Sequence, residues 1–166
     1  MSKCKSFLPS VNKNSKILIL GSMPGVKSLE AQEYYAHPQN RFWKVMGFLC
    51  NCPDLSGFEY QKKLETLLNN GFALWDVIKT CKRKGSLDSD ITDEIPNDIL
   101  GLLKQYKNLK IVILNGNKAY SALKKHIPQV FQEYQCFKMP STSPANACFR
   151  LEDLCKEWQK TLKSSV

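Results

Sequence analysis

Short apolar runs alternate along this chain with segments in which apolar residues recur at helical spacing. The runs occupy residues 17–21, 72–77, 110–115 and 135–139. Strands buried on both faces of a parallel sheet have such continuous aliphatic runs, so we predict four strands. Elsewhere apolar residues fall at i, i+3, i+4 and i+7, which predicts helices; the clearest sets start at Phe42, Ile99 and Leu151. This alternation indicates an α/β fold with helices covering a central sheet.

The first apolar run ends in the turn Gly21-Ser22-Met23-Pro24-Gly25. Glycine permits close approach of the backbone to a ligand, and Pro24 fixes φ. Ligands of open α/β sheets bind beyond the carboxyl ends of the strands. We therefore expect this turn to form part of a pocket for a phosphate, a nucleotide or a base. Glycine-rich turns after strands also occur without such a role, and the turn alone leaves that alternative open.

Polar residues follow the predicted strands and should meet on one rim, because the carboxyl ends of parallel strands share an edge. They are mainly amides and hydroxyls: Ser22, Asn115, Asn117, Ser141, Thr142, Ser143 and Asn146. An amide side chain presents a donor and an acceptor together and can read the edge of a base. Aromatic rings can stack on a base, and those nearby are Tyr34, Tyr35, Phe42 and Trp43. The inventory predicts recognition of a nucleobase.

Composition adds an argument from charge. The 166 residues, 43% of them hydrophobic, predict one globular domain. A net charge of +9 favours a polyanionic partner, either a nucleic acid or an acidic membrane, and leaves an ordinary solvated basic surface as the alternative. Three consecutive cations, Lys82, Arg83 and Lys84, lie in segment 80–93, which we expect to be an exposed loop. The ends, residues 1–14 and 163–166, are expected to be loose.

Several kinds of protein and site are not expected. No stretch approaches the roughly 18 apolar residues of a membrane span, and the polar start lacks the apolar segment of a signal peptide. We expect a cytoplasmic monomer without membrane contact, and a nuclear location stays open. Seven cysteines are an odd number without CxxC spacing, which favours reduced thiols. With two histidines as further candidate ligands, we expect no metal site and no cofactor.

Segments spread over the chain together resemble the uracil-DNA glycosylase superfamily, and most closely its hypoxanthine-DNA (deoxyinosine) glycosylase branch. They are GSMPGVKSL, HPQNRFW, LWDV with the following KRKGSLDSDI, and PSTSPAN, in the family's order between about residues 16 and 160. The resemblance implies a three-layer α/β/α sandwich around a four-stranded parallel sheet. It also implies a DNA repair enzyme of base excision that hydrolyses the N-glycosidic bond of a flipped nucleotide, in duplex or single-stranded DNA, without a metal.

The sequence departs from the commonest family pattern at two positions. Met23 stands where most branches have Asp, Glu or Asn, and a thioether cannot position the attacking water. The resemblance implies that Asn40 has this catalytic role instead; the alternative is that Asn40 only caps a helix beginning at Arg41. Ser141 stands where several branches have His or Asn to stabilise the leaving base, and its hydroxyl can donate one hydrogen bond.

The remaining expectations assign the other site residues. The base pocket is expected to contain Gly21, Ser22, Met23, Pro24, Phe42, Asp76 and Asn115. Contacts to DNA are expected from Lys27, Arg41, Lys82, Arg83, Lys84, Ser143 and Asn146. No lysine is expected inside the pocket, so the enzyme should be monofunctional. Ala145 stands where other branches have a larger apolar wedge, which leaves Asn146, Phe149 or Arg150 to fill the vacated base stack. A uracil or mismatch-specific glycosylase and a non-catalytic nucleic-acid-binding module remain alternatives.

Overall fold

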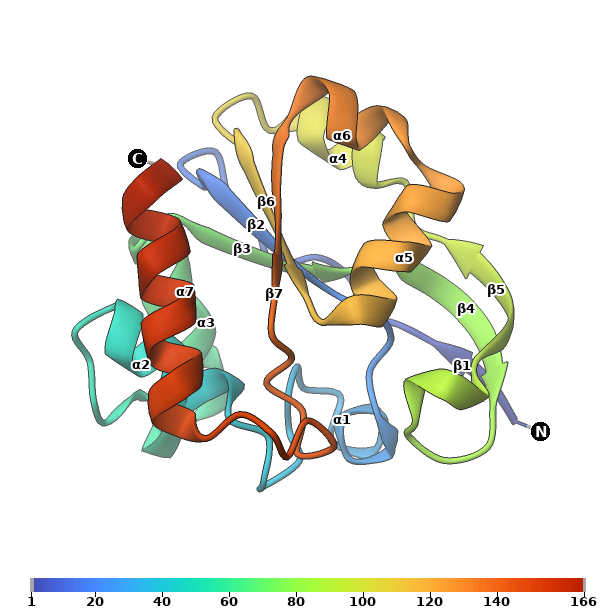
Figure 1. Ribbon diagram of the computed structural model, residues 1–166, viewed down its shortest axis with the longest axis horizontal. Helices are drawn as coiled ribbons and strands as arrows, with labels where there is room; N and C mark the ends of the chain where they lie inside the picture. Colours follow the sequence, from blue (N-terminus) through green and yellow to red (C-terminus); the bar gives the residue numbers. More distant parts are fainter. Residues whose placement is uncertain (1, 166) are drawn as a thin grey trace.

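The computed structural model describes residues 2–165 and contains a larger parallel sheet and a smaller antiparallel one (Figure 1). The parallel sheet has the strand order β3-β2-β6-β7. Its strands are β2 (Ile17–Gly21), β3 (Phe72–Asp76), β6 (Ile111–Asn115) and β7 (Gln135–Met139). The register pairs Ile17 of β2 with Phe72 on one side and Ile111 on the other. The predicted four-stranded parallel sheet is confirmed, with two strands one residue shorter than expected.

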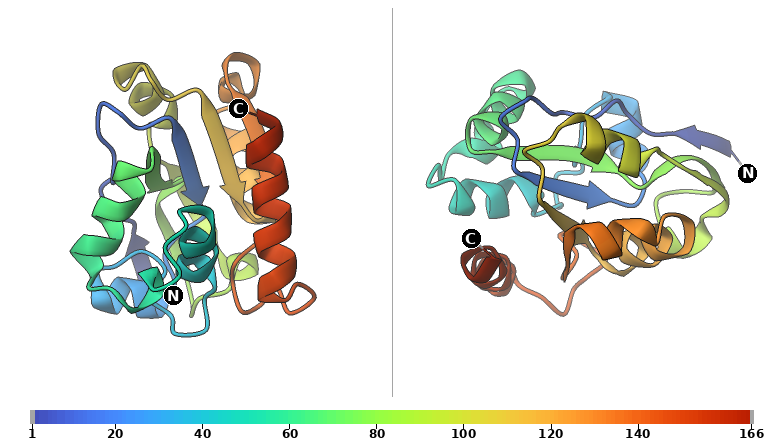
Figure 2. Two further views of the ribbon diagram at one scale, coloured as in Figure 1. Left: turned by 90° about the vertical axis from the view of Figure 1, so that its left-hand side faces the viewer. Right: turned by 90° about the horizontal axis from the view of Figure 1, so that it is seen from above.

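Helices cover both faces of the parallel sheet. One face carries α2 (Phe42–Leu49), α3 (Tyr60–Asn69) and α7 (Leu151–Ser165), on the left in Figure 1. The other carries α4 (Ile99–Gln105), α5 (Asn117–His126) and α6 (Gln129–Glu133). Short helical turns occur at α1 (Val26–Ala31), η1 (Leu55–Gly57) and η2 (Asp88–Asp90). The views of Figure 2 show the sheet between the two helical layers. This is the expected α/β/α sandwich.

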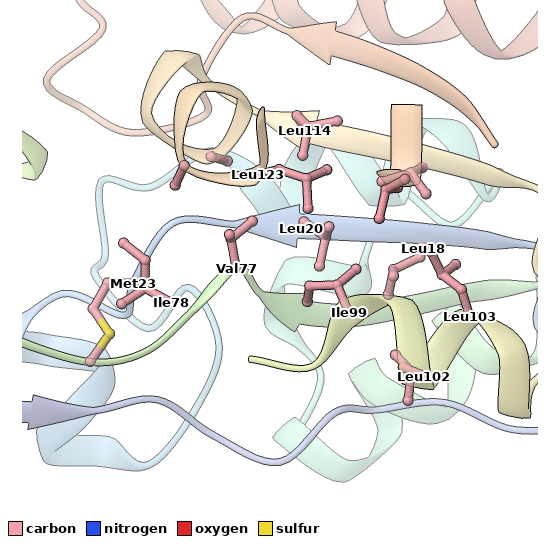
Figure 3. Close-up of a cluster of buried hydrophobic side chains, with 14 of the residues drawn as sticks. Leu18, Leu20, Met23, Val77, Ile78, Ile99, Leu102, Leu103, Leu114 and Leu123 are labelled. Atoms are coloured by element: carbon pink, nitrogen blue, oxygen red, sulfur yellow. The ribbon is translucent and has the colours of Figure 1, made fainter. Parts of the chain in front are cut away.

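The strands are continuous apolar runs because each successive side chain enters a core. In β2, Leu18 and Leu20 belong to the core under α4 and α5, shown in Figure 3. Ile19 belongs to the core under α2 and α7, and all three side chains are fully buried. Alternate side chains of a strand point to opposite faces, so a sheet covered on both sides needs apolar residues at every position.

The smaller sheet was not predicted. It has the antiparallel order β1-β4-β5, formed by β1 (Ser2–Lys5), β4 (Ile78–Arg83) and β5 (Thr92–Pro96). The expectation of an exposed loop over residues 80–93 is therefore wrong at both ends of that segment. The pairing of β4 with β5 shifts register twice, and Arg83 is a buried, inward-facing cation. Both features break the alternation that normally marks a half-buried strand.

Both chain ends form secondary structure within the described residues. β1 pairs with β4, and Ser10 forms a bridge with Leu74 of β3. At the other end α7 continues through residue 165. The expectation that residues 1–14 and 163–166 are loose stays a prediction; residues 1 and 166 lie outside the described part. No helix within residues 2–165 combines the length and the apolar character needed to cross a membrane.

Candidate active site

The segments that follow β2, β3, β6 and β7 gather at the lower edge of the sheet in Figure 1 and enclose a cavity of about 750 Å³. Most predicted site residues line it: Gly21, Ser22, Met23, Pro24, Lys27, Asn40, Asp76, Asn115, Ser141, Ser143 and Asn146. Five predicted residues are not part of the lining: Arg41, Phe42, Lys82, Arg83 and Lys84. The strand ends therefore build a common pocket, as expected, and Phe42 is the one residue assigned to the base pocket that does not line it. Arg41, Lys82, Arg83 and Lys84 were expected to contact DNA and not to line the pocket.

Gly21 allows a buried carboxyl group to lie against the backbone at the end of β2. A Cβ at this position would lie 2.5 Å from Asp76 Oδ1 and 3.0 Å from the Tyr35 hydroxyl. Neither atom belongs to an exposed surface, so any side chain here would displace part of the cavity wall. The glycine is needed for close approach, as the sequence predicted.

Asp76 is the buried acid of this cavity. It is 4% exposed, and its Oδ2 atom has no hydrogen-bond partner within residues 2–165. Burial, together with the nearby Asp88 carboxylate, raises the pKa of Asp76 to about 7, although the charge of Arg83 acts in the opposite direction. Near neutral pH the carboxyl group therefore exists in both protonation states and retains unused hydrogen-bonding capacity.

Arg83 does not present its charge to solvent. Its residue exposure is 1%, and its Nη2 donates to the carbonyl of Pro24. Nε and Nη1 have no partner in the described chain. The expectation that Arg83 contacts DNA is wrong for this reason: the guanidinium lies behind the turn at residues 21–25 and supports it.

Met23 and Ser22 fix the other parts of this turn. Met23 is 6% exposed and belongs to the core cluster of Figure 3 while also lining the cavity. Ser22 donates its hydroxyl to Asp88 Oδ1 at 2.6 Å. The backbone N–H of Val26 donates to Ser86 Oγ at 2.8 Å. The loop between β4 and β5 is thereby held against the cavity wall at two points.

Asn40 lines the cavity, and its side chain accepts from the first N–H of α2. The helix begins at Phe42 and its N-cap position is Arg41, so the expected helix start at Arg41 with Asn40 as N-cap is wrong by one residue. Its Oδ1 accepts a hydrogen bond from the Phe42 N–H at 2.9 Å, and its own N–H donates to the His37 carbonyl at 2.9 Å. Because the Phe42 N–H can only donate, the amide oxygen must face it, and Nδ2 holds the unused donors. Nδ2 has no acceptor among residues 2–165, so this hydrogen bond and a catalytic role are compatible.

The aromatic residues that line the cavity are Tyr34, Tyr35 and Phe149, and Phe42 is not among them. Phe42 is fully buried, and the Tyr35 ring stacks on it with a centroid distance of 3.9 Å. Trp43 also faces the core, and its Nε1 donates to the Tyr34 carbonyl. The prediction that Phe42 belongs to the base pocket is therefore wrong. Of the four aromatic candidates, Tyr34 and Tyr35 line the cavity and Phe42 and Trp43 do not, a distinction that only the tertiary fold reveals.

Asn115 uses both ends of its amide to hold the loop at residues 140–149. Its Nδ2 donates to Thr142 Oγ1 at 3.0 Å, and its Oδ1 accepts from the Thr142 N–H at 3.1 Å. Nδ2 also lies 3.3 Å from the Tyr35 hydroxyl. Asn115 lines the cavity as predicted, but within this structure its amide positions the loop.

Arg41 binds the same loop from the opposite side. Its guanidinium donates to the carbonyls of Thr142, Ser143, Asn146 and Phe149. The Ser143 contact is 2.7 Å long. These four acceptors occupy most of the five N–H donors of an arginine. The expectation of a DNA contact from Arg41 is not supported, because the side chain organises the loop instead.

Ser141 retains a donor toward the cavity. Its Oγ accepts from the Ser143 N–H at 3.1 Å, which leaves the hydroxyl hydrogen to be donated elsewhere. Asn146 Nδ2 donates to the Ser141 carbonyl at 3.0 Å. Ser141 is therefore in a position to donate a hydrogen bond to a leaving base, as predicted. The Asn146 amide holds the backbone of Ser141 and is not itself free for a ligand.

Lysines are present in the cavity wall, contrary to expectation: Lys27, Lys118 and Lys138 all line it. Lys118 Nζ lies 2.6 Å from Glu94 Oε2, and Lys138 Nζ lies 5.4 Å from the centroid of the Tyr120 ring. Lys27 is exposed on α1. Sequence reasoning missed Lys118 and Lys138 because each belongs to a helix or strand whose register only the fold reveals.

The chain matches the family model described as the Uracil DNA glycosylase superfamily over residues 8–163. The chain belongs to this superfamily. A hypoxanthine DNA glycosylase of Methanosarcina acetivorans is 37% identical over 161 residues, covering 96% of this chain and 98% of the relative. Another from Methanosarcina barkeri is 43% identical over 117 residues, covering 70% and 73%.

A solved structure with a similar fold supports the assignment to this superfamily. The solution NMR structure of a Methanosarcina acetivorans protein, described as a candidate uracil DNA glycosylase, has a TM-score of 0.79 to this chain. Its sequence is 36% identical, and the alignment covers 93% of this chain and 94% of the other. The resemblance read from the motifs is thus confirmed at the level of the superfamily.

Proposed function

We propose that this member of the superfamily excises hypoxanthine from DNA by flipping the deoxyinosine nucleotide into the cavity and hydrolysing its N-glycosidic bond. The observation that carries the proposal is Asn40, which lines the cavity, accepts from the Phe42 N–H and has no acceptor for its amino group among residues 2–165. Two relatives named hypoxanthine DNA glycosylase, one aligned along nearly the whole chain, support the choice of base.

In the proposed mechanism Asn40 positions the attacking water. An amide is not a strong base, but cleavage through an oxocarbenium-like state needs mainly a positioned water and a preorganised polar environment. The fixed amide plane meets that requirement, because its orientation does not have to be established during the reaction. Met23 shapes the cavity without taking part, since its side chain is embedded in the core.

The leaving base is stabilised from the opposite side of the cavity. The Ser141 hydroxyl has one hydrogen available and donates it to the purine as negative charge develops on the base. Asp76 reads the base edge: its neutral form offers a donor and an acceptor, which match the adjacent O6 and N1–H of hypoxanthine. Its partly protonated state near neutral pH makes this pairing available.

The reaction is proposed to be monofunctional. A lyase needs an amine that reaches the sugar and forms a Schiff base with it. Lys118 is held by Glu94 and Lys138 lies over the Tyr120 ring, while Lys27, the third lysine of the lining, is exposed on α1 and is proposed to meet phosphate. Sodium borohydride should therefore trap no covalent protein–DNA adduct from inosine-containing duplex. A trapped adduct that disappears on Lys118→Ala would contradict the assignment.

A single assay tests the function. Duplexes with one inosine, uracil or xanthine are incubated with the protein, abasic sites are cleaved with alkali, and the released base is identified by mass spectrometry. We expect release of hypoxanthine by the wild type and its loss in Asn40→Ala. Release of uracil alone would support a uracil glycosylase, and tight binding without release would support a non-catalytic binding module.

A further inference from the structure

Two cysteines face each other across the smaller sheet, and the proposed chemistry gives neither of them a role. β1 is an edge strand that pairs with β4, and the register places Cys4 directly opposite Cys81 (Figure 1). Residues that lie opposite each other on neighbouring strands have their side chains on the same face of the sheet. That face is the core under α4 and α5, where Cys81 is 1% exposed and Cys4 is half-buried.

The spacing of the two backbones suits a disulfide bond. Two residues further along the same pairing, the Ser6 N–H donates to the Lys79 carbonyl at 2.9 Å. Hydrogen-bonded and non-hydrogen-bonded pairs alternate along an antiparallel ladder, so Cys4 and Cys81 also form a hydrogen-bonded pair, whose Cα atoms lie about 5.5 Å apart in standard geometry. Disulfides most often join Cα atoms about 5.5–6 Å apart. The bond can therefore form with little movement of either strand.

The two thiols differ in how readily they react. Burial raises the pKa of the Cys81 thiol, and the neighbouring Cys4 thiol raises it further, both by its charge and by a hydrogen bond with Cys81. Because the thiolate is the reactive form, Cys81 is slow to react with a reagent in solution. Cys4 is the more exposed of the pair, so an oxidant meets Cys4 first and finds Cys81 beside it.

We propose that Cys4 and Cys81 are an oxidation site, which takes hydrogen peroxide and forms a cross-strand disulfide. The Cys4 thiolate attacks the peroxide, its O–O bond breaks, and Cys4 becomes a sulfenic acid while one water is released. The Cys81 sulfur then attacks the sulfenic sulfur, so that the S–S bond forms and the sulfenic oxygen leaves as a second water. The two thiols together lose two electrons and two protons, which the peroxide takes up.

The disulfide fixes the sheet that supports one side of the cavity. β4 continues from Cys81 to Arg83, whose Nη2 donates to the Pro24 carbonyl. A bond between Cys4 and Cys81 closes a long loop of the chain, which restricts the unfolded state. We therefore expect oxidation to raise the melting temperature by at least about 5 °C. Neither cysteine belongs to the cavity lining, so the bond does not obstruct the site.

The first test treats the folded protein with hydrogen peroxide, blocks the remaining thiols in denaturant and compares migration in a denaturing gel without reductant. The wild type should migrate faster and melt higher, both changes should be reversed by dithiothreitol, and peptide mapping should join Cys4 to Cys81. Cys4→Ser should abolish both changes, and Cys148→Ser, which removes an exposed cysteine outside the sheet, should retain them. A treated wild type without the Cys4–Cys81 bond, or with an unchanged melting temperature, overturns the proposal.

A second experiment tests the order of the two steps with dimedone, a reagent that labels sulfenic acids. In Cys81→Ala the sulfenic acid on Cys4 lacks the thiol with which it condenses, so labelling of Cys4 should be at least about 10-fold higher than in the wild type. Cys81→Val, which fills the core position, should behave in the same way. Equal labelling in the wild type and both variants overturns the proposed step. Neither experiment measures base release, so their outcome is independent of the proposed function.

Discussion

The two walls of the cavity differ in how completely their polar groups are bonded. The loop wall, residues 140–149, has its carbonyls bound by Arg41 and its Thr142 backbone and side chain bound by Asn115. The turn wall, residues 21–25 with Asp76 and Arg83 behind them, contains three buried polar atoms that have no partner in the described chain. The polar groups of the loop wall form a hydrogen-bond network, whereas the turn wall contains polar atoms that can still form hydrogen bonds with a ligand.

This difference predicts that substitutions in the two walls will change different properties of the protein. A satisfied network is costly to break because removing one member leaves its buried partners unpaired, so the loop wall should respond to substitution mainly in stability. The buried Asp76 carboxyl group has a raised pKa and an unpaired oxygen, so the turn wall should respond in pH dependence and base recognition. Asn40 lies on the segment between them and combines both properties, with its oxygen bonded and its amino group unpaired.

The largest effect is expected at Asn40. Asn40→Ala should lower the single-turnover rate of hypoxanthine release by roughly 100-fold or more, the scale of removing one preorganised polar group, with little change in affinity for inosine-containing DNA. Asn40→Asp keeps the oxygen that accepts from the Phe42 N–H and removes the amino group. Partial activity in Asn40→Asp indicates water positioning, and activity as low as in Asn40→Ala indicates donation to the base. Wild-type rates in a folded Asn40→Ala variant would leave the hydrogen bond from the Phe42 N–H as the only role of Asn40.

Arg41 tests the loop wall. Arg41→Ala leaves four carbonyls without their donor and should lower the free energy of unfolding by about 3 kcal/mol, within the usual range for breaking a charged hydrogen-bond network. Urea unfolding measures the change. Arg41→Lys should recover only part of it, because one ammonium cannot reach acceptors spread along the loop. A stability loss below about 0.5 kcal/mol, the level of an ordinary surface substitution, would show that the two walls do not differ as described.

Substitution of Asp76 tests the turn wall through the pH dependence of folding stability. Its folded pKa is raised to about 7 from an ordinary value of 3.8, so the folded protein holds this proton more tightly than the unfolded chain. The associated stability is complete below the unfolded pKa and is lost as pH rises from about 4 to about 7. Asp76→Asn cannot ionise, so its stability relative to wild type should increase over that range, by roughly 4 kcal/mol at pH 8, because each tenfold change in proton affinity corresponds to about 1.4 kcal/mol. Thermal unfolding at pH 4, 6 and 8 measures this; a difference independent of pH would refute the raised pKa.

The two walls also differ in what the sequence could reveal. The strand ends predicted that Gly21, Asp76 and Asn115 would meet, because period and burial place the ends of parallel strands at one edge. The partners of Arg41 lie 101 to 108 residues away in the chain. The sequence does not distinguish an arginine on the surface from one that is bound within the structure, so the role of Arg41 could not be derived from it.

The same limit explains the unexpected second sheet. The parallel sheet was predictable because helices on both sides require apolar residues along every strand. β4 has polar residues at several positions, an inward-facing Arg83 and two register shifts, and β5 has Ile95 57% exposed. Neither strand carries a regular period, so local pattern could not identify them. Their pairing depends on contacts with each other and with β1.

The smallest effect is expected from the surface lysines next to the turn wall. Lys82 and Lys84 are exposed, and Lys82 Nζ lies 3.2 Å from Asp93 Oδ2 in a pair open to solvent. Replacing both with Ala should weaken binding to all DNA sequences alike. It should also reduce the slope of log K against log salt by about 0.9 for each phosphate that these two side chains neutralise in the wild type.

The control for this variant is Lys104→Ala with Lys107→Ala, which removes the same charge near the end of α4, away from the cavity. Because Arg83 is buried and Arg41 is engaged by the loop, Lys82, Lys84 and Lys27 are the predicted cations still free to meet phosphates. An unchanged slope in the Lys82 and Lys84 variant, or an equal reduction in the control, would place the DNA elsewhere than beside the turn wall.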